Sequence, residues 1–397
     1  MKEGWEYIDF KDVFPIKMGK TPPRGDKSSW DEKKETHNKW VSIADISNNE
    51  GKIIEDTKEY ISDSAAEKIS KVSKGSLLMS FKLSIGRMAF AGDDLYTNEA
   101  IIAIPENDKY ILRFIYYYLL SYDWLSLTEG NEKVKGATLN KTSIGKIQLP
   151  VLSIIEQQSI VDYLDSAFAK IDAMKANAEK ALNEAKALFQ ASLKEMLEPK
   201  EGWEEKKLDD IGELKNGMNF NKNESGYNIH ILGVGDFGNL FQIEDTDYLQ
   251  RIALNSNPSE EYILKNEDIV FVRSNGNKNL VGRCVLIHVG DEPCFFSGFC
   301  IRFRKSTNEV DACYLTYFLK TEESRRKLVG NGANISNLNQ KVLNEFVVSY
   351  PSIQEQQSIV ETLDSLKSKV DRLQENYDKI SQECDALKQA ILRQVFE

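Results

Sequence analysis

The sequence is short of the residues from which most metal and catalytic sites are built. Its 397 residues hold only three histidines, His37, His230 and His288, and five cysteines that form no C-x-x-C pair. A zinc site needs closely spaced Cys or His ligands, so we expect no metal. The odd cysteine count favours free thiols in a reducing compartment over a disulfide framework.

Short motifs of nucleotide-dependent enzymes are also missing. There is no G-x-x-x-x-G-K-[ST] phosphate loop and no D/N-P-P-Y/F motif of adenine methyltransferases. The letters GVGDFG at 233–238 are followed by no helical pattern, so we interpret them as a turn. We therefore predict no catalytic residues and no cofactor, and we expect that the chain is not an enzyme.

Long apolar runs are absent too. The most apolar stretch, residues 110–125, carries Arg113 and Asp123 and is too short for a bilayer, so we expect a buried helix there. The start has no apolar run behind its single lysine, which argues against a signal peptide and favours a cytoplasmic protein with no membrane partner. The net charge of −11 argues against a simple basic nucleic-acid binder.

The sequence contains an imperfect tandem repeat. Residues 156–172 align with 355–371 at a constant offset of 199, and 11 of the 17 positions are identical. The letters EGWE at Glu3 return at Glu201. A period near 200 is far longer than that of a solenoid and indicates a duplicated domain. We predict domains at 1–150 and 199–350, each followed by a long helix, at 151–198 and 351–397.

Each predicted helix begins at a capping box, Ser153 with Glu156 and Ser352 with Glu355. No Gly or Pro interrupts either helix, so each is expected to run about 43 residues, or roughly 65 Å. In both helices apolar residues step by three and four, which is typical of a coiled-coil seam. The predicted interface is Leu164, Ile171, Met174, Ala178, Ala181, Ala185 and Leu188 against Leu363, Leu366, Val370, Leu373, Tyr377, Ile380, Cys384, Leu387 and Ile391.

The alanines in the middle of the first seam match larger residues in the second, which favours an antiparallel pair with the two domains at opposite ends. The alternative is that each helix only covers its own domain.

In both domains, short β-branched and aromatic runs precede helical stretches. The strand candidates are residues 39–46, 75–81, 99–104, 230–237, 268–274, 283–289 and 299–304. This order predicts an α+β fold with curved mixed or antiparallel sheets plus helices.

Polar, glycine-punctuated loops fall at equivalent places in the two domains, yet their residues differ. Arg, Lys, Asn and similar side chains contact base edges and phosphates, so these loops are candidate DNA-binding segments, although any one of them is more often a solvated loop. The candidates are Lys20, Thr21, Arg24, Lys27, Ser80, Lys82, Ser84 and Arg87 in the first domain, and Asn219, Lys222, Asn223, Arg273, Ser274, Asn275, Lys278 and Arg283 in the second.

This organisation resembles the specificity subunit of type I restriction-modification systems. The matching segments are GWE at 4–6, MGKTPPR at 18–24, WVSIADI at 40–46 and DIVFVRSNG at 268–276, together with the two EQQSIV helix starts. The second domain lacks the Thr-Pro-Pro-Arg signature, so its early loop is expected to contact DNA differently.

The resemblance implies a non-catalytic subunit in which each domain recognises one half of a bipartite double-stranded DNA site. The antiparallel coiled coil would set the spacer and dock two methyltransferase subunits, which restriction and translocase subunits then join. Two other classes stay open from the residues alone: a coiled-coil scaffold whose end domains bind proteins, and a self-contained nuclease or methyltransferase.

Overall fold

The computed structural model describes residues 2–127, 135–221, 224–329 and 337–397. The chain divides into two compact units. The first unit is Met1–Ala178 with Asp378–Glu397, and the second is Glu179–Tyr377. The division falls in the middle of the two long helices, α5 (Ile154–Leu197) and α10 (Ile353–Phe396), rather than at their ends.

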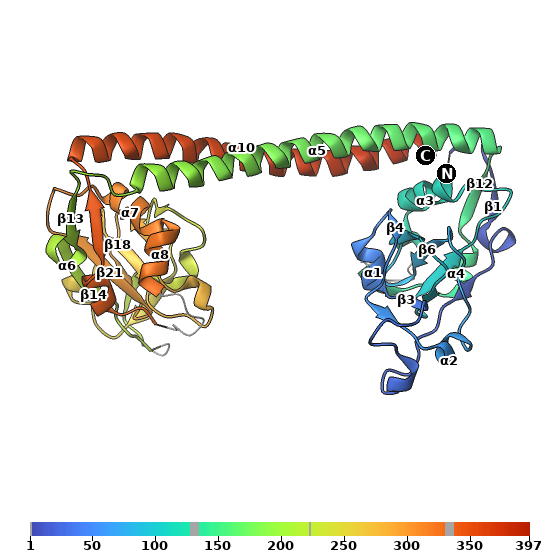
Figure 1. Cartoon of the computed structure of the whole chain (residues 1–397), viewed down its shortest axis with the longest axis horizontal. Helices are drawn as coiled ribbons and strands as arrows, with labels where there is room; N and C mark the ends of the chain where they lie inside the picture. Colours follow the sequence, from blue (N-terminus) through green and yellow to red (C-terminus); the bar gives the residue numbers. More distant parts are fainter. Residues whose placement is uncertain (1, 128–134, 222–223, 330–336) are drawn as a thin grey trace. The chain divides into compact units, whose positions relative to one another are not determined.

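The first unit is built on a five-stranded sheet of order β2-β10-β6-β8-β4 (Figure 1). All neighbours in it are antiparallel except β4 and β8. A three-stranded sheet, β5-β3-β9, and two strand pairs, β1-β12 and β7-β11, complete it. The strands are β1 (Glu6–Asp9), β2 (Lys17–Met18), β3 (Lys39–Val41), β4 (Ile53–Ile54), β5 (Glu59–Tyr60), β6 (Leu77–Ser80), β7 (Lys82–Ser84), β8 (Met88–Ala91), β9 (Tyr96–Thr97), β10 (Ile101–Ile104), β11 (Lys135–Thr138) and β12 (Gln148–Val151).

The second unit repeats this topology. Its five-stranded sheet has the order β14-β21-β18-β19-β16, its three-stranded sheet is β17-β15-β20, and β13 pairs with β22. In place of the β7-β11 pair, its described residues form one bridge, between Ser274 and Asn337. The strands are β13 (Glu204–Lys207), β14 (Gly212–Asn216), β15 (Tyr227–Leu232), β16 (Gln242–Ile243), β17 (Arg251–Leu254), β18 (Ile269–Val272), β19 (Cys284–Ile287), β20 (Cys294–Phe296), β21 (Cys300–Lys305) and β22 (Val347–Tyr350).

The shorter helices also occur in matching places. In each unit one apolar helix lies between the five-stranded sheet and the long helices, α3 in the first and α7 in the second (Figure 1). The expected buried helix at 110–125 is α3, whose Phe114, Ile115 and Leu119 are fully buried. The bounds are α1 (Ile43–Asn48), α2 (Asp63–Ala66), α3 (Leu112–Ser121) and α4 (Lys141–Gly145), then α6 (Leu208–Ile211), α7 (Ala312–Lys320), α8 (Glu322–Val329) and α9 (Gln340–Asn344).

Two predicted strands are too long. Residues 39–46 form β3 only as far as Val41, because Ser42 caps α1: its amide donates to Asp45 Oδ2 (2.8 Å) and its hydroxyl accepts from the Asp45 amide (3.4 Å). Residues 230–237 leave the strand after Leu232 and turn through a 3₁₀ segment, Val234–Asp236. The interpretation of GVGDFG as a turn is therefore confirmed.

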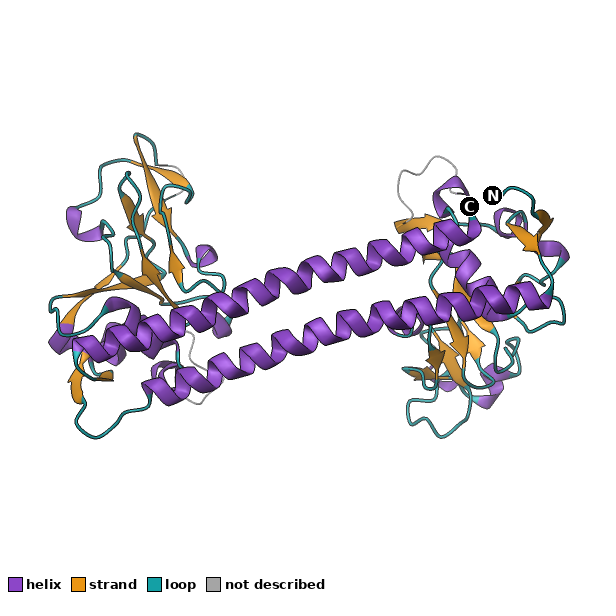
Figure 2. Cartoon of the chain, turned by 90° about the horizontal axis from the view of Figure 1, so that it is seen from above, coloured by secondary structure: helices purple, strands orange, loops and turns teal. Residues whose placement is uncertain are grey.

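Each long helix is a single element of 44 residues, seen without a break in Figure 2. The first begins at the predicted capping box, where the Ser153 amide donates to Glu156 Oε2 (2.9 Å) and the Glu156 amide to Ser153 Oγ (3.3 Å). In the second, the Glu355 amide donates to Ser352 Oγ (3.4 Å). Within the described residues, no helix combines the length and apolarity needed to cross a bilayer.

A buried glutamine joins each long helix to the domain that precedes it. Gln157 is fully buried; its Oε1 accepts from the Ile111 amide (2.9 Å), and its Nε2 donates to the carbonyl oxygens of Lys109 (2.9 Å) and Leu152 (3.0 Å). Gln356 makes the same three bonds, to the Asp311 amide and the carbonyls of Glu309 and Pro351, each at 2.8 Å. The repeated EQQ letters thus mark a structural joint.

Each unit also takes in the far end of the other long helix. Leu392 and Phe396 of α10 belong to the core of the first unit, and Leu193 and Leu197 of α5 belong to the core of the second. In the first unit Lys388 pairs with Asp172, and Lys175 with Asp385 (3.6 Å). As the residue numbers rise along α5 they fall along α10, so the helices in this unit run antiparallel.

Three of the seven predicted seam residues of the first helix are exposed. Met174 and Leu188 are 59% and 60% exposed, and Ala181 is also exposed. Leu164 and Ile171 are buried, Ala178 and Ala185 are half-buried, and the intervening positions are Phe168, Lys175, Leu182 and Phe189. Lys175 interrupts the apolar letters of this phase because it pairs with Asp385, so the sequence pattern favoured the neighbouring phase.

The predicted residues of the second helix are more buried. Leu363 and Cys384 are buried, and Leu366, Val370, Leu373, Tyr377, Ile380 and Ile391 are half-buried. Leu387 is 47% exposed and is wrong, because Lys388 takes that place and lies 5.2 Å above the ring of Phe168.

Replacement of the joint glutamine tests its structural role. Gln356→Ala leaves the Asp311 amide and two carbonyls without their partner, so we expect the free energy of unfolding of the second unit to fall by about 2–4 kcal/mol. Urea unfolding measures this change. The neighbouring exposed Gln357→Ala is the control and should stay within about 0.5 kcal/mol of the parent. Equal effects of the two substitutions would show that the hydrogen bonds of Gln356 do not stabilise the second unit.

Candidate nucleic-acid interface

In the second unit two of the predicted polar loops meet at one turn. The turn is residues 297–299, between β20 and β21. The amides of Arg273 and Ser274 both donate to the Phe299 carbonyl (2.8 and 3.3 Å), and Arg273 also donates through its guanidinium to Gly298 O (3.3 Å). From the other side, the Gly298 amide donates to Met218 O (2.9 Å). The backbone therefore brings segments 218–221 and 273–276 together.

A groove of about 840 Å³ opens beside this junction. Ser274, Asn275, Asn221 and Gln250 supply hydroxyl and amide groups to its lining, together with the rings of Phe220 and Phe299. Phe299 is 60% exposed, which is unusual for a ring of this size. Amides that donate and accept, next to an exposed aromatic ring, are side chains suited to contact the edges and faces of bases.

The carboxylates of this groove are already engaged by the protein. Glu224 accepts from the amides of Asn221 (2.9 Å) and Asn255 (3.2 Å), and these backbone bonds lower the pKa of its carboxyl. Asp236 accepts from the Gly233 amide (2.8 Å). Both carboxylates therefore accept hydrogen bonds from backbone amides and stabilise the conformation of the loops.

Asn219 reaches this junction because residue 298 is a glycine. A Cβ at position 298 would lie 2.0 Å from Asn219 Oδ1, so any larger residue would displace the amide. Gly217 is equally constrained, since a Cβ there would lie 2.0 Å from Ser297 O. These two glycines allow the strands to approach closely and set where the amide of Asn219 lies.

The first unit places different chemistry at the same positions. Sheet register gives the correspondence, because Ile101 pairs with Ser80 as Cys300 pairs with Val272, so Glu99 takes the place of Gly298. The hydroxyl of Thr21 donates to Glu99 Oε2, and Lys82 lies near enough to act on the same carboxyl. The bond from Thr21, with a smaller contribution from Lys82, lowers the pKa of Glu99. Thr21, Lys82 and Glu99 therefore form one ionised polar cluster.

Glu99 was missed in the sequence. Its segment, 99–104, was interpreted as a strand, and the search was for basic and amide side chains. The repeat carried a usable signal: TNEA at 97–100 stands directly before β10, where FSGF at 296–299 stands before β21. The sequence-based candidates also lack three residues of the groove, Phe299, Asn221 and Gln250. Only the pairing of the strands shows that these residues lie together.

One predicted contact is wrong, and two others have structural partners. Ser80 is fully buried and donates its hydroxyl to Ser84 O inside the hairpin, so it does not face a ligand. Arg24 lies 4.2 Å from the ring of Trp30 and 4.8 Å from that of Trp40, and it pairs with Glu59. Arg87 pairs with Glu50 (2.7 Å).

The remaining candidates have mixed positions. Lys20 and Lys27 are exposed, Ser84 lies half-buried on β7, and Arg283 donates to Gly238 O (2.9 Å) and Asn239 Oδ1 (3.1 Å). Lys278 begins a short 3₁₀ helix, Lys278–Leu280. Lys222 and Asn223 lie outside the described residues.

Together these features define a duplicated α+β chain with one scaffold and two different sets of polar surface groups. The sequence model of the type I restriction modification DNA specificity domain matches residues 2–184 and again 200–382. The chain belongs to this family.

Named relatives agree. The StySPI specificity subunit of Salmonella potsdam is 27% identical over 282 residues, which are 66% of this chain and 60% of the relative. The EcoKI specificity subunit of Escherichia coli K12 is 25% identical, with the same two coverages. The chain thus spans about 60% of the length of these two relatives. The MjaVIII specificity subunit of Methanocaldococcus jannaschii is 23% identical, and 79% of each chain is covered.

Solved structures share the fold. A chain from a type I R-M system, solved in work on its complex assembly and conformational transition, has a TM-score of 0.76 at 16% identity and covers 100% of this chain and 98% of its own. The HsdS subunit of Thermoanaerobacter tengcongensis has a TM-score of 0.59 at 16% identity and covers 100% and 97%. At this identity the likeness establishes the fold and nothing further.

The environment of Arg24 separates a structural role from a DNA-binding one. Arg24→Ala removes two cation–π contacts and an ion pair, so we expect it to lower the free energy of unfolding by about 1–2 kcal/mol. Arg24→Lys should recover only part of this, because an ammonium does not stack as a planar guanidinium does.

Thermal and urea unfolding are the measurements, with the exposed Lys27→Ala as the control of equal charge change. If Arg24→Ala were as stable as Lys27→Ala, the contacts of Arg24 with the two tryptophan rings would not stabilise the first unit.

Proposed function

We propose that this chain is the DNA-recognition subunit of a type I restriction-modification enzyme, and that each unit recognises one half of a bipartite double-stranded site. The observation that carries the proposal is the pair of equivalent junctions. The sheets around them match strand for strand, whereas one junction holds Thr21, Lys82 and Glu99 and the other Asn219, Ser274 and Gly298.

These groups have distinct preferences for bases. A carboxylate such as Glu99 accepts from the exocyclic amine of cytosine, and an amide such as Asn219 or Asn275 makes two bonds with adenine. Two junctions that differ in this way are expected to select different bases, so the two halves of the site should differ.

The chain itself is proposed to lack catalysis, and to act in the cytoplasm. Among the described residues, no three His, Cys, Asp or Glu side chains are placed to hold a metal ion. Burial raises the pKa of Cys294 and Cys300 to about 12, which keeps both as neutral thiols. The chemistry is therefore assigned to partner subunits.

The long helices are the proposed docking surface for two methyltransferase subunits, which restriction and translocase subunits would then join. Several large apolar side chains on α5 stay exposed within their units, among them Ile155 (79%) and Tyr163 (52%) in the first and Leu188 (60%) in the second. Exposed apolar residues of this size on a helix are typical of a protein interface. The same helices are proposed to set the distance between the two half-sites.

A coiled-coil scaffold whose end domains bind proteins remains the alternative class. It offers no reason for the glycine-dependent placement of Asn219 or for the ionised Thr21–Glu99 cluster. Co-purification with an adenine methyltransferase and mapping of methylated sites separates the two.

Substitution at one junction should alter one half-site. We expect Glu99→Gln, which replaces a carboxylate acceptor with an amide, to change or relax the preferred base in a single half of the methylated sequence, at a discrimination of about 1–3 kcal/mol. The measurement is genome-wide mapping of methylation in cells that express the chain with its methyltransferase.

Asn257→Ala, at an exposed position outside both pocket and groove, is the control and should leave both halves unchanged. A change in both halves after Glu99→Gln would contradict the modular assignment.

The isolated chain should bind DNA weakly and with a steep dependence on salt. Its net charge of −11 leaves phosphate contacts to a few local cations. With about six such contacts, affinity falls by about a thousandfold between 50 and 200 mM salt. Fluorescence anisotropy with a labelled duplex measures the slope. A tight, sequence-specific complex of the chain alone at physiological salt would overturn this prediction.

A further inference from the structure

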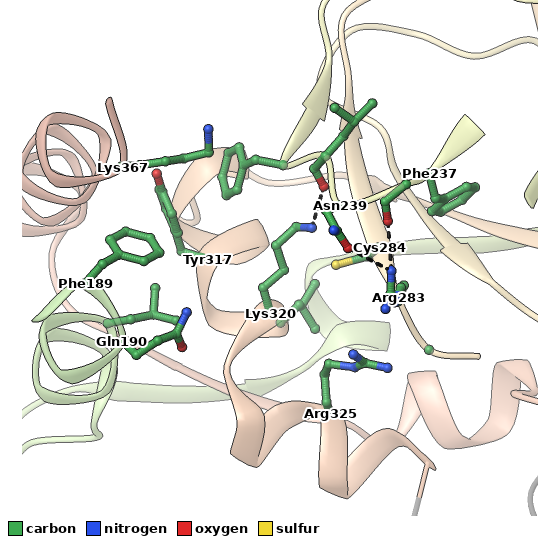
Figure 3. A pocket seen from close by; sticks show the side chains of 16 residues that line it. Phe189, Gln190, Phe237, Asn239, Arg283, Cys284, Tyr317, Lys320, Arg325 and Lys367 are labelled. Atoms are coloured by element: carbon green, nitrogen blue, oxygen red, sulfur yellow. Dashed lines mark hydrogen bonds between the residues drawn. The ribbon is translucent and has the colours of Figure 1, made fainter. Parts of the chain in front are cut away.

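The second unit contains another pocket, which shares no lining residue with the groove beside residues 297–299. It has a volume of about 360 Å³ and is lined by the start of β19, the end of α7, residues of α8 and the loop before β16 (Figure 3). Phe189 of α5 and Lys367 of α10, both within this unit, complete its wall.

Three cationic side chains converge on this pocket from three separate elements. Lys320 ends α7, Arg325 belongs to α8 and Arg283 directly precedes β19. Figure 3 shows their charged ends around the same space, on either side of Cys284. No Asp or Glu is among the residues that line the pocket. Within the described residues, these three cations take part in no ion pair, whereas Lys367 pairs with Asp371 (2.7 Å).

Neutral oxygen atoms accept the described hydrogen bonds of these cations. Lys320 donates to Leu240 O (2.7 Å), and Arg283 donates to Gly238 O and Asn239 Oδ1. Arg325 donates to Asn279 O (3.1 Å). These bonds hold the surrounding loops, but they compensate no charge.

Two signs of uncompensated charge are visible. The Nε atoms of Arg283 and Arg325 are buried, and neither finds a hydrogen-bond partner among the described groups. Burial, with a further contribution from the neighbouring cations, lowers the pKa of Lys320 and of Arg325. A nearby anion would relieve both effects.

In the first unit, the arginine at the place of Arg283 is paired with a carboxylate. Arg87 directly precedes β8 as Arg283 precedes β19, and Glu50 stands three residues before β4 as Asn239 stands three before β16. Arg87 and Glu50 form an ion pair at 2.7 Å, whereas Arg283 meets only the neutral amide of Asn239. The second unit has therefore an asparagine where the first has the neutralising carboxylate.

We propose that this pocket binds a phosphate group. Guanidinium and ammonium donors from three elements match the several oxygen atoms of a phosphate. The volume admits a phosphate with part of its ester, and the rings of Phe189, Phe237 and Tyr317 offer apolar contact to that part. The phosphate is that of a free ion or small ester, or that of a DNA backbone. The site goes beyond base recognition; a DNA phosphate at this site would rest on the proposed function, whereas a free phosphate would not.

Asn239→Glu places a carboxylate beside Arg283, as Glu50 lies beside Arg87 in the first unit. This carboxylate would occupy the place of a bound phosphate. Asn239 is exposed, so a glutamate fits without repacking. We expect phosphate, compared with chloride at equal ionic strength, to raise the Tm of the full chain, and calorimetry to show phosphate affinity about tenfold lower in Asn239→Glu. Arg325→Gln should give a similar loss by removing a donor. Asn257→Glu, exposed and outside both pocket and groove, is the control of equal charge change.

Binding of a short DNA duplex, measured beside binding of inorganic phosphate, distinguishes the two sources of the phosphate. If inorganic phosphate binds the parent and the control about tenfold more tightly than Asn239→Glu, the site takes a free phosphate. If inorganic phosphate binds none of them, but Asn239→Glu weakens binding of a short duplex about tenfold relative to Asn257→Glu, the ligand is a DNA phosphate. If Asn239→Glu changes neither measurement relative to the control, the proposal is wrong.

Discussion

Within each unit, a buried amide determines how the long helix leaves its domain. Gln157 and Gln356 each satisfy one backbone amide and two carbonyls, and all of these groups belong to the segments that lead into α3 or α7 and into the long helix itself. Because the amide is buried, each bond that is lost leaves an unsatisfied polar group. The direction of the helix is thereby fixed relative to the core, and the core is then closed by the far end of the other helix.

This joint explains why the helix starts repeat while the loops do not. A tyrosine adds to it in each unit: Tyr110 donates to Pro150 O (3.1 Å) and Tyr314 to Ser349 O (2.9 Å). Tyr117 and Tyr317 bond to the helix carboxylates Asp165 and Asp364. The two glutamine amides are fully buried and need fixed partners, so these two positions tolerate little change. The polar junctions contact solvent and are free of that constraint.

The parts of the fold that depend on local patterns were predictable. A repeat offset, a Ser-x-x-Glu cap and an unbroken apolar period are all visible in the letters, and they gave the duplication, the helix starts and the α+β class. The phase of the seam was not predictable. Lys175 is a charged residue, yet it lies at the interface between the helices because it pairs with Asp385. Strand ends failed where a capping serine, Ser42, ended the strand and began a helix.

The candidate site was predictable only as loops. Which loops meet depends on strand order, and the order β14-β21-β18 brings residues 216–221, 297–299 and 273–276 together although they are far apart in sequence. Glu99 and Phe299 were invisible for that reason, and Ser80 was misplaced because its hydroxyl closes a hairpin. Charge compensation has the same dependence on the fold. The change from Glu50 to Asn239 is one position in a loop, yet only the pairing of Arg87 shows that it leaves Arg283 of the second unit without a carboxylate. A duplicated scaffold thus diverges by exchanging individual partners at fixed positions, while the buried hydrogen bonds that hold those positions stay the same.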